Sequence, residues 1–260
     1  MSDSTSKFTG KADGYARHRP AYPEGALDYI SSLADKKFMI ADIGAGTGIF
    51  TRQLLQRGYS VAAVEPNADM RKKAEQELQG FAGFLSLNAT AEDTKLAAQS
   101  IGLVTAAQSF HWFDQEKFRL ECVRILRPGG TAVLLWNSRD PQSPMVEELA
   151  EICRQFCPAF KGFSGGRTDE WDEWFRRFFQ DGKYVHRRFS HPLPFDRNGF
   201  IGRAMSASYA PDETMAGPFM EAVGTVFDRY QVVGMAMLPN QTDVYAGKVR
   251  TDELYTDYSV

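Results

Sequence analysis

The sequence predicts an α/β fold in which a mostly parallel sheet carries helices on both of its faces. Between residues 38 and 136, short apolar segments alternate with longer segments of helical periodicity. Alternating strands and helices build parallel sheets, because each helix returns the chain to the start of the next strand. A glycine-rich turn, Gly44–Gly48, follows the first strand, which is where folds of this kind bind ligands.

Local signals fix the ends of several elements. Pro23 begins a helix that extends to Ala34, because a proline in the first helical position sacrifices no hydrogen bond. Asn67 and Gly80 are suited to cap the two ends of one helix. Strands are expected at residues 38–43, 60–65, 81–87, 101–107 and 131–136, the last one after a Pro128–Gly130 turn, and further helices at 49–57, 67–79 and 115–126.

The alternation changes after Asn137. Helices are expected at 145–156, 170–179, 198–207 and 213–230, with extended segments at 184–195 and 235–249. We therefore expect a single domain, residues 1–260. Its parts are an N-terminal lid segment (1–34), a ligand-binding core (38–137), a helical cap interleaved with the last strands (138–232) and a C-terminal strand (233–260).

Composition restricts the class of protein. Of 260 residues, 43 % are hydrophobic and 24 % charged, and no apolar run approaches the roughly 18 residues of a membrane span. Residues 1–7 lack the pattern of a signal peptide, so we expect a cytoplasmic protein that does not enter membranes. The formal charge of −3 argues against a nucleic-acid partner. One basic cluster exists, and it is expected to be the solvated face of a strand: Lys183, His186, Arg187 and Arg188.

The cysteines predict neither a disulfide framework nor a metal site. There are three of them, and only Cys153 and Cys157 are spaced to share a helix face. A metal would need further ligands at suitable spacing, which the neighbouring sequence lacks. Buried free thiols are therefore expected, together with no bound metal.

The glycine turn is the most informative motif. It reads G-x-G-x-G, whereas a dinucleotide fingerprint reads G-x-G-x-x-G and would require glycine at Ile49. This difference argues against an oxidoreductase that binds NAD. Glu65 ends the second strand about 20 residues later, where an acid can accept both hydroxyls of a ribose. The alternative is that Glu65 only caps the following helix.

These motifs resemble those of the class I methyltransferases that use S-adenosylmethionine (SAM). The resemblance rests on Asp42–Gly48, Glu65 and the Leu126–Gly130 turn. It implies a Rossmann-like, seven-stranded sheet with a helical cap. A closer resemblance is to a small-molecule subgroup, methyltransferase type 11-like, that includes relatives of trans-aconitate and azapteridine methyltransferases. It is carried by Phe8–Ala12, Tyr15, Arg19, Pro20, Tyr22, Pro23 and Ser109–Phe113.

The resemblance implies how SAM would be held. The methionine part would lie against Asp42, Gly44, Ala45, Gly46, Thr47 and Gly48, with Gln108 nearby. The ribose would bind to Glu65, and the adenine would contact Pro66, Met70, Ala91 and Glu92. Tyr15 and Arg19 would close over the cofactor. The chain departs from the family at Asn88 and Ala89, one of which is usually glycine.

Methyl transfer is an in-line displacement, so the protein mainly has to align the reacting atoms. A base is needed only where the nucleophile carries a proton, and His111, after the fourth strand, is the candidate. Phe110 and Trp112 beside it suit a substrate pocket and a sulfonium. The alternative is that His111 only shapes this pocket. Tyr209 is a candidate hydrogen-bond donor to substrate or a packing residue, and the aromatic residues of 170–179 line a cavity or pack in the core.

The sequence thus predicts a methyltransferase that moves a methyl group from SAM to oxygen or nitrogen of a small-molecule acceptor, leaving S-adenosylhomocysteine. Two other functions stay open, a methyltransferase that acts on RNA through the basic cluster and a SAM-binding module without catalysis. The sequence identifies neither the acceptor nor the oligomeric state.

Overall fold

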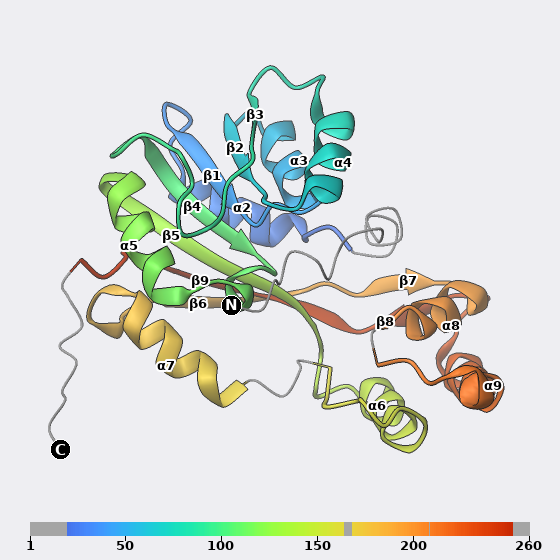
Figure 1. The fold of residues 1–260 in the computed structure, drawn as a ribbon. Coiled ribbons are helices and arrows are strands. Elements are labelled where there is room, and N and C mark those ends of the chain that lie inside the picture. The colour runs from blue at the N-terminus through green and yellow to red at the C-terminus, as the bar shows by residue number, and fades with distance from the viewer. Residues whose placement is uncertain (1–19, 164–167, 208, 252–260) are drawn as a thin grey trace, which may run out of the picture. The chain divides into compact units, whose positions relative to one another are not determined.

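A computed structural model describes residues 20–163, 168–207 and 209–251 (Figure 1). The chain divides into two compact units. The first unit combines the described residues up to Trp136 with Asp169–Arg188 and the described residues from Asp243 onward. The second unit consists of Asn137–Thr168 and Phe189–Thr242. Tyr15 and Arg19, two of the predicted SAM contacts, lie outside the described residues.

The helices and strands follow the predicted order, and the expected extended segments 184–195 and 235–249 each divide into two strands. The α-helices are α2 (Glu24–Leu33), α3 (Ile49–Gln56), α4 (Ala68–Leu78), α5 (Gln115–Ile125), α6 (Pro144–Phe156), α7 (Thr168–Phe178), α8 (Arg197–Met205) and α9 (Glu213–Tyr230). Two short 3-10 helices are η2 (Phe110–Trp112) and η3 (Gln180–Gly182). The strands are β1 (Met39–Ile43), β2 (Val61–Val64), β3 (Phe84–Leu87), β4 (Ile101–Ala107), β5 (Leu126–Arg139), β6 (Val185–Ser190), β7 (Leu193–Phe195), β8 (Ala236–Leu238) and β9 (Asn240–Gly247).

The main sheet has seven strands in the order β3-β2-β1-β4-β5-β9-β6 (Figure 1). β1 pairs in parallel with both β2 and β4, so that Asp42 lies between Ala63 and Thr105. β2 pairs in parallel with β3, and β4 with β5. The strand order reverses between β1 and β4, because the chain first builds outward to β3 and then returns to the other side of β1. The predicted mostly parallel sheet is confirmed, and its reversal point is where such sheets bind ligands.

The residues of β1 show that both faces of this sheet are covered. Ala41 and Ile43 belong to a core that also contains residues of α5 and α7. Asp42, which points to the opposite face, contacts Thr51 of α3. This alternation is the period of two expected of a strand buried on both sides. The predicted arrangement of helices on both faces is therefore confirmed.

An aromatic cluster connects α5 and α7 on one face of the sheet. The rings of Phe118 and Phe178 stack with their centres 5.5 Å apart, and Phe110 packs edge-on against both. Phe175 is also fully buried. Trp171 and Trp174 pack on the edge of this core and are only partly buried. Of the two interpretations of the 170–179 segment, the packing of an apolar helix face accounts for these contacts.

Strand β5 is longer than the predicted strand at 131–136. The expected Pro128–Gly130 turn lies inside β5, which runs from Leu126 to Arg139. The pairing partners change from Ile101 and Leu126 to Leu103 and Thr131, so extra residues of β5 are accommodated as an irregularity in the strand. Gly129 has a φ of 81°, which suits glycine at such a point.

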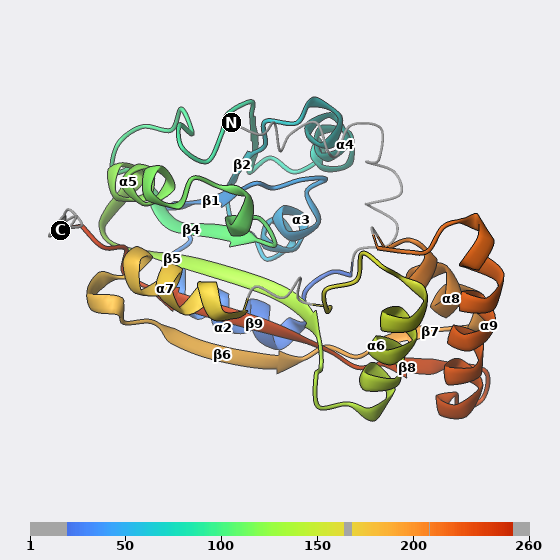
Figure 2. The same cartoon turned by 60° about the horizontal axis from the view of Figure 1, so that its bottom comes forward.

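The second unit is built around α6, α8 and α9, which gather beside an antiparallel pair formed by β7 and β8 (Figure 2). Its apolar core contains Phe200, Phe219 and Phe227 from the helices and Leu238 from β8. Cys153 and Cys157 are buried in the same core. All three cysteines of the chain, including Cys122 in the first unit, are free thiols, as predicted.

The charges of the basic cluster have partners within the first unit. His186 and Arg188 both contact the Oδ1 atom of Asp243 at 2.7 Å. Arg187 lies over the ring of Tyr29, and Lys183 is 3.8 Å from Asp181. These contacts are those of a solvated strand face. Among the described residues, no helix has both the length and the apolar character that crossing a bilayer requires.

The ring of Phe178 is 1 % exposed, so the aromatic cluster predicts a large loss of stability for Phe178→Ala. The substitution removes a stacked ring and leaves a cavity, which costs about 3–5 kcal/mol of unfolding free energy. Urea denaturation measures the change. Leu120→Ala on α5 is the control, because Leu120 is 51 % exposed and its loss changes stability by at most about 0.5 kcal/mol. Equal effects of the two substitutions would contradict the assignment of this core.

Candidate active site

Four segments of predicted site residues meet at one edge of the sheet. They follow the carboxyl ends of β1, β2, β3 and β4, which are mutually parallel. The segments are Gly44–Gly48, Glu65–Met70, Asn88–Glu92 and Gln108–Trp112. Because these strands run in the same direction, the segments share the edge at which the strand order reverses.

The three positions of the turn require glycine for different structural reasons. All have positive φ angles, 68° at Gly44, 58° at Gly46 and 80° at Gly48. A Cβ atom on Gly44 would lie 2.6 Å from the Cβ of Ser109, and one on Gly48 would lie 2.7 Å from Leu78. A Cβ on Gly46 would meet no atom of the described residues within 4 Å. Packing therefore explains two of the glycines, while Gly46 leaves its backbone open to a ligand.

Backbone hydrogen bonds fix the first residues of the turn, whereas the side chain of Thr47 is buried without a hydrogen bond among the described residues. The N–H groups of Gly44 and Ala45 donate to the carbonyl of Val64, at 2.9 and 3.1 Å. The hydroxyl of Thr47 is buried and forms no hydrogen bond within the described part of the chain. An unsatisfied buried hydroxyl is costly, and a polar ligand at the turn would remove that cost. Thr47 and Gly46 thus fit a polar cofactor at this position.

Asp42, at the end of β1, holds the strand that leads into the turn in contact with α3 and β4. Its carboxylate is 1 % exposed and accepts hydrogen bonds from the hydroxyls of Thr51, at 2.6 Å, and Thr105, at 3.1 Å. Burial raises the pKa of Asp42 to about 6, although both threonines lower it, and the nearby charge of Glu65 adds to the rise. The side chain of Asp42 therefore connects β1 with α3 and β4.

Glu65 connects the ends of β1 and β2. One oxygen of its carboxylate accepts from the N–H of Gly46 and the other from the N–H of Asn67, both at 2.8 Å. Burial raises the pKa of Glu65, while these two bonds and the charge of Arg71 oppose the rise. Each oxygen retains a lone pair for a further donor, such as a ribose hydroxyl. The cap of α4 is Asn67 itself, which accepts from Asp69 and Met70.

Three of the predicted adenine contacts are apolar side chains. Met70 and Ala91 are buried and Pro66 is partly buried. A guanidinium nitrogen of Arg71 donates to the carbonyls of Glu65 and Pro66 and to the side-chain oxygen of Asn88. Asn88, where the family usually has glycine, thus serves to join the segments after β2 and β3.

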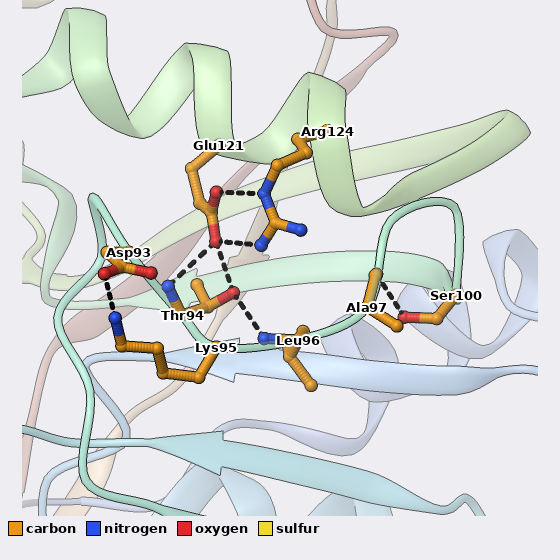
Figure 3. A network of polar contacts seen from close by, with 8 residues as sticks. All are labelled: Asp93, Thr94, Lys95, Leu96, Ala97, Ser100, Glu121 and Arg124. Carbon is orange, nitrogen blue, oxygen red and sulfur yellow. Dashed lines mark hydrogen bonds and ion pairs between the residues drawn. The ribbon is translucent and has the colours of Figure 1, made fainter.

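The segment after β3 is anchored to α5 by a buried carboxylate (Figure 3). Glu121 accepts from the N–H and the hydroxyl of Thr94, at 2.8 and 2.5 Å, and from Arg124 at 2.7 Å. Burial acts to raise the pKa of Glu121, but the bonds from Arg124 and Thr94 outweigh it and lower that pKa. Glu92 adds a second anchor, because its carboxylate accepts from the N–H of Asp114 at 2.9 Å.

The segment after β4 contains a strained residue and the candidate base. Gln108 has a φ of 60°, which is unfavourable for a residue other than glycine and is common at functional sites. Trp136 donates from its indole nitrogen to Nδ1 of His111 at 3.4 Å. Trp112 is 40 % exposed beside His111. Gln108 and His111 are partly buried.

Two predicted substrate contacts are packed against other rings. Phe110 is fully buried and surrounded by Phe118, Phe178 and other rings of the first unit's core. Tyr209 belongs to the second unit, where its ring packs against Phe160.

Residues 41–134 match the family model described as a methyltransferase domain. This part of the chain is therefore similar to methyltransferase domains. An uncharacterized methyltransferase of Mycobacterium tuberculosis is 37 % identical over 150 residues, which cover 58 % of this chain and 60 % of that relative. An uncharacterized methyltransferase-like protein of Schizosaccharomyces pombe is 32 % identical over 168 residues, which cover 62 % and 64 %. The chain thus spans less than two thirds of the length of these relatives.

Solved structures agree on the fold. A proposed type II methyltransferase from Anaeromyxobacter dehalogenans superposes with a TM-score of 0.66 at 19 % identity, covering 90 % of this chain and 99 % of that one. A proposed methyltransferase from an antibiotic biosynthesis pathway of Anabaena variabilis gives a TM-score of 0.59 at 20 % identity, with 86 % and 97 % covered. The Rossmann-like methyltransferase fold is therefore confirmed.

Sequence reasoning missed the side chains that hold the candidate site in place. Thr51 and Thr105 gave no signal, because their partner Asp42 is distant from Thr105 in the chain. Glu121 and Arg124 had a detectable signal, an acid and a base three residues apart on a predicted helix. That spacing predicts an exposed ion pair, however, and not a buried carboxylate that also binds Thr94.

The raised pKa of Asp42 predicts a specific dependence of stability on pH. Its pKa in the folded state, about 6, exceeds the ordinary aspartate pKa of 3.8, so the native state binds more protons between these two pH values. The contribution of Asp42 to stability is therefore greatest at low pH and is lost as the pH rises through about 6. Relative to Asp42→Asn, the wild type should gain about 2 kcal/mol between pH 7 and pH 4.5. Urea denaturation of both proteins at the two pH values measures this, and a pH-independent difference would refute it.

Proposed function

We propose that this chain transfers a methyl group from SAM to an oxygen or nitrogen atom of a small-molecule acceptor and releases S-adenosylhomocysteine. The observation that carries the proposal is the turn after β1, where an open Gly46 and an unsatisfied Thr47 hydroxyl lie beside the carboxylate of Glu65. The turn lies within the part of the chain that is similar to methyltransferase domains, and that family implies SAM as the methyl donor.

The residues present fit SAM along the edge of the sheet. Glu65 has lone pairs left for the ribose hydroxyls, and the partly apolar surface of Pro66, Met70 and Ala91 suits the adenine. Thr47 and Gly46 would lie against the methionine part. Gln108 at the end of β4, together with Tyr15 and Arg19, remains a predicted contact.

Catalysis would depend on positioning. Bound SAM supplies an electrophilic methyl group on a positively charged sulfur. The protein has to place the acceptor atom in line with the methyl–sulfur bond and to keep water away. The exposed aromatic side chain of Trp112 suits a positive charge, because the faces of aromatic rings attract cations.

The contact between Trp136 and His111 bears on the role of the histidine. A neutral imidazole that accepts a hydrogen bond at Nδ1 carries its own proton on Nε2 and is a donor there. This tautomer favours the interpretation in which His111 orients the acceptor and shapes the pocket. A base that used Nε2 would require the Trp136 contact to break.

The competing functions have less support. An RNA acceptor would need free cations, whereas His186 and Arg188 share Asp243 and Arg187 lies over Tyr29. NAD would need a glycine at Ile49, which instead begins α3. A SAM-binding module without catalysis would bind SAM and turn over no acceptor.

Glu65→Ala should weaken SAM binding by about tenfold or more, because the ribose hydroxyls lose their acceptors and the Gly46 turn loses a hydrogen bond. Isothermal titration calorimetry with SAM, S-adenosylhomocysteine and, as a control, NAD measures this. Glu75→Ala, an exposed acid on α4, is the matched variant and should bind normally. Binding of NAD alone to the wild type would overturn the proposed function, and equal affinity in Glu65→Ala would remove Glu65 from the site.

His111→Ala distinguishes the two roles of the histidine. We expect SAM affinity to change by less than about twofold and the pH dependence of turnover to keep its shape, because His111 orients the acceptor without accepting its proton. Methyl transfer from radiolabelled SAM is followed between pH 6 and 9, with His186→Ala as the control. Loss of an ionisation from the rate profile in His111→Ala alone would establish the base role instead.

A further inference from the structure

The second unit contains a narrow cavity between α6, α8 and α9 and the ends of β5 and β8. The volume of the cavity is about 10 Å³, which is room for a single water molecule. Apolar side chains form most of its wall, among them Leu149, Phe200 and Val223. Three polar side chains complete it: Arg139, Arg203 and Tyr209. No Asp or Glu lines this cavity among the described residues.

Arg139 is held in the cavity by neutral groups. Its guanidinium carbon lies 4.1 Å from the centre of the Phe163 ring. It also donates a hydrogen bond to the hydroxyl of Tyr209, whose ring packs against Phe160 at 5.0 Å. No carboxylate of the described residues forms an ion pair with Arg139. The contacts therefore orient the guanidinium without neutralising its charge.

The electrostatics of the cavity favour an anion. Burial lowers the pKa of Arg139, the hydrogen bond to Tyr209 opposes this, and the positive charge of Arg203 lowers the pKa further. Burial likewise raises the pKa of Tyr209, which keeps its hydroxyl proton available for donation. Two cations that face one apolar cavity repel each other, and an anion between them would remove both the repulsion and the cost of burying the charge.

We propose that Arg139, Arg203 and Tyr209 form a site in the second unit that binds the carboxylate of a small organic acid. The proposal is independent of the methyl transfer proposed above, because every residue that lines the cavity belongs to the second unit. The planar fork of a guanidinium matches the two oxygens of a carboxylate, and a flat group suits a narrow cavity better than tetrahedral phosphate does. The apolar walls would contact the carbon skeleton beside the carboxylate. The cavity has to widen to admit a carboxylate, and the repulsion between Arg139 and Arg203 favours this widening.

Binding of three probes tests the site without relying on turnover. Butyrate, glutarate and phenylacetate, with their neutral amides, are titrated into the full chain saturated with S-adenosylhomocysteine, and binding is measured by saturation-transfer NMR. We expect at least one carboxylate to bind about tenfold or more tightly than its amide. Inorganic phosphate has no carbon-bound protons to observe, so it is added as a competitor and should displace the bound carboxylate only at about tenfold higher concentration. Arg139→Met should abolish this preference, and Arg139→Lys should retain part of it because the charge remains without the fork.

Matched variants make the outcomes distinct. Arg154→Met removes an exposed arginine of α6, paired with Glu147, and should leave carboxylate binding unchanged. The thermal midpoint of Arg139→Met is measured to confirm folding, and calorimetry should show that it binds SAM like the wild type. If SAM binds but no carboxylate outcompetes its amide, or if Arg139→Met keeps the preference, the site is refuted while the proposed function stands. If SAM fails to bind to any of these proteins, the proposed function fails.

Discussion

The hydrogen bond from the Gly46 N–H to Glu65 is the interaction on which the candidate site depends. It joins the turn after β1 to the end of β2, and the second oxygen of the same carboxylate accepts from Asn67 at the start of α4. A left-handed Gly46 whose Cβ position is empty has no packing to hold it. The carboxylate therefore determines where the open backbone of the turn lies, while leaving capacity for a ligand.

Buried carboxylates organise the candidate site at two further points, and their pKa values show how differently they are stabilised. Asp42 receives only neutral threonine hydroxyls, so burial dominates and its pKa rises to about 6. Glu121 is partnered by the cation of Arg124 as well as by Thr94, and its pKa falls. Asp42 thus reduces the stability of the native state at neutral pH, whereas Glu121 adds to it. The position of the turn has a stability cost that the rest of the core must offset.

The parts that were predictable from sequence are those encoded by neighbouring residues. Strand–helix alternation predicted the parallel sheet, and the glycine pattern predicted the Gly44–Gly48 turn beside Glu65, because each signal lies within a few residues of the turn it forms. Contacts between distant segments gave no signal: Thr105 is 63 residues from Asp42, and Trp136 is 25 from His111. The burial of Phe110 gave no signal for the same reason, since the rings that bury it come from α5 and α7. Burial is a property of the assembled fold, and one aromatic motif does not report it.

The division of the chain into two units separates the sequence motifs from the arginine cavity. The motifs that carry the methyltransferase resemblance all lie in the first unit. Arg139 is the last residue of β5, only three residues after Trp136, and yet it is packed in the second unit by Phe163 and Tyr209. No local pattern distinguishes this arginine from a surface arginine. Its proposed role follows from what it lacks among the described residues, a carboxylate partner, and a charge held by neutral contacts in an apolar cavity is a stronger indication of a ligand than any spacing in the sequence.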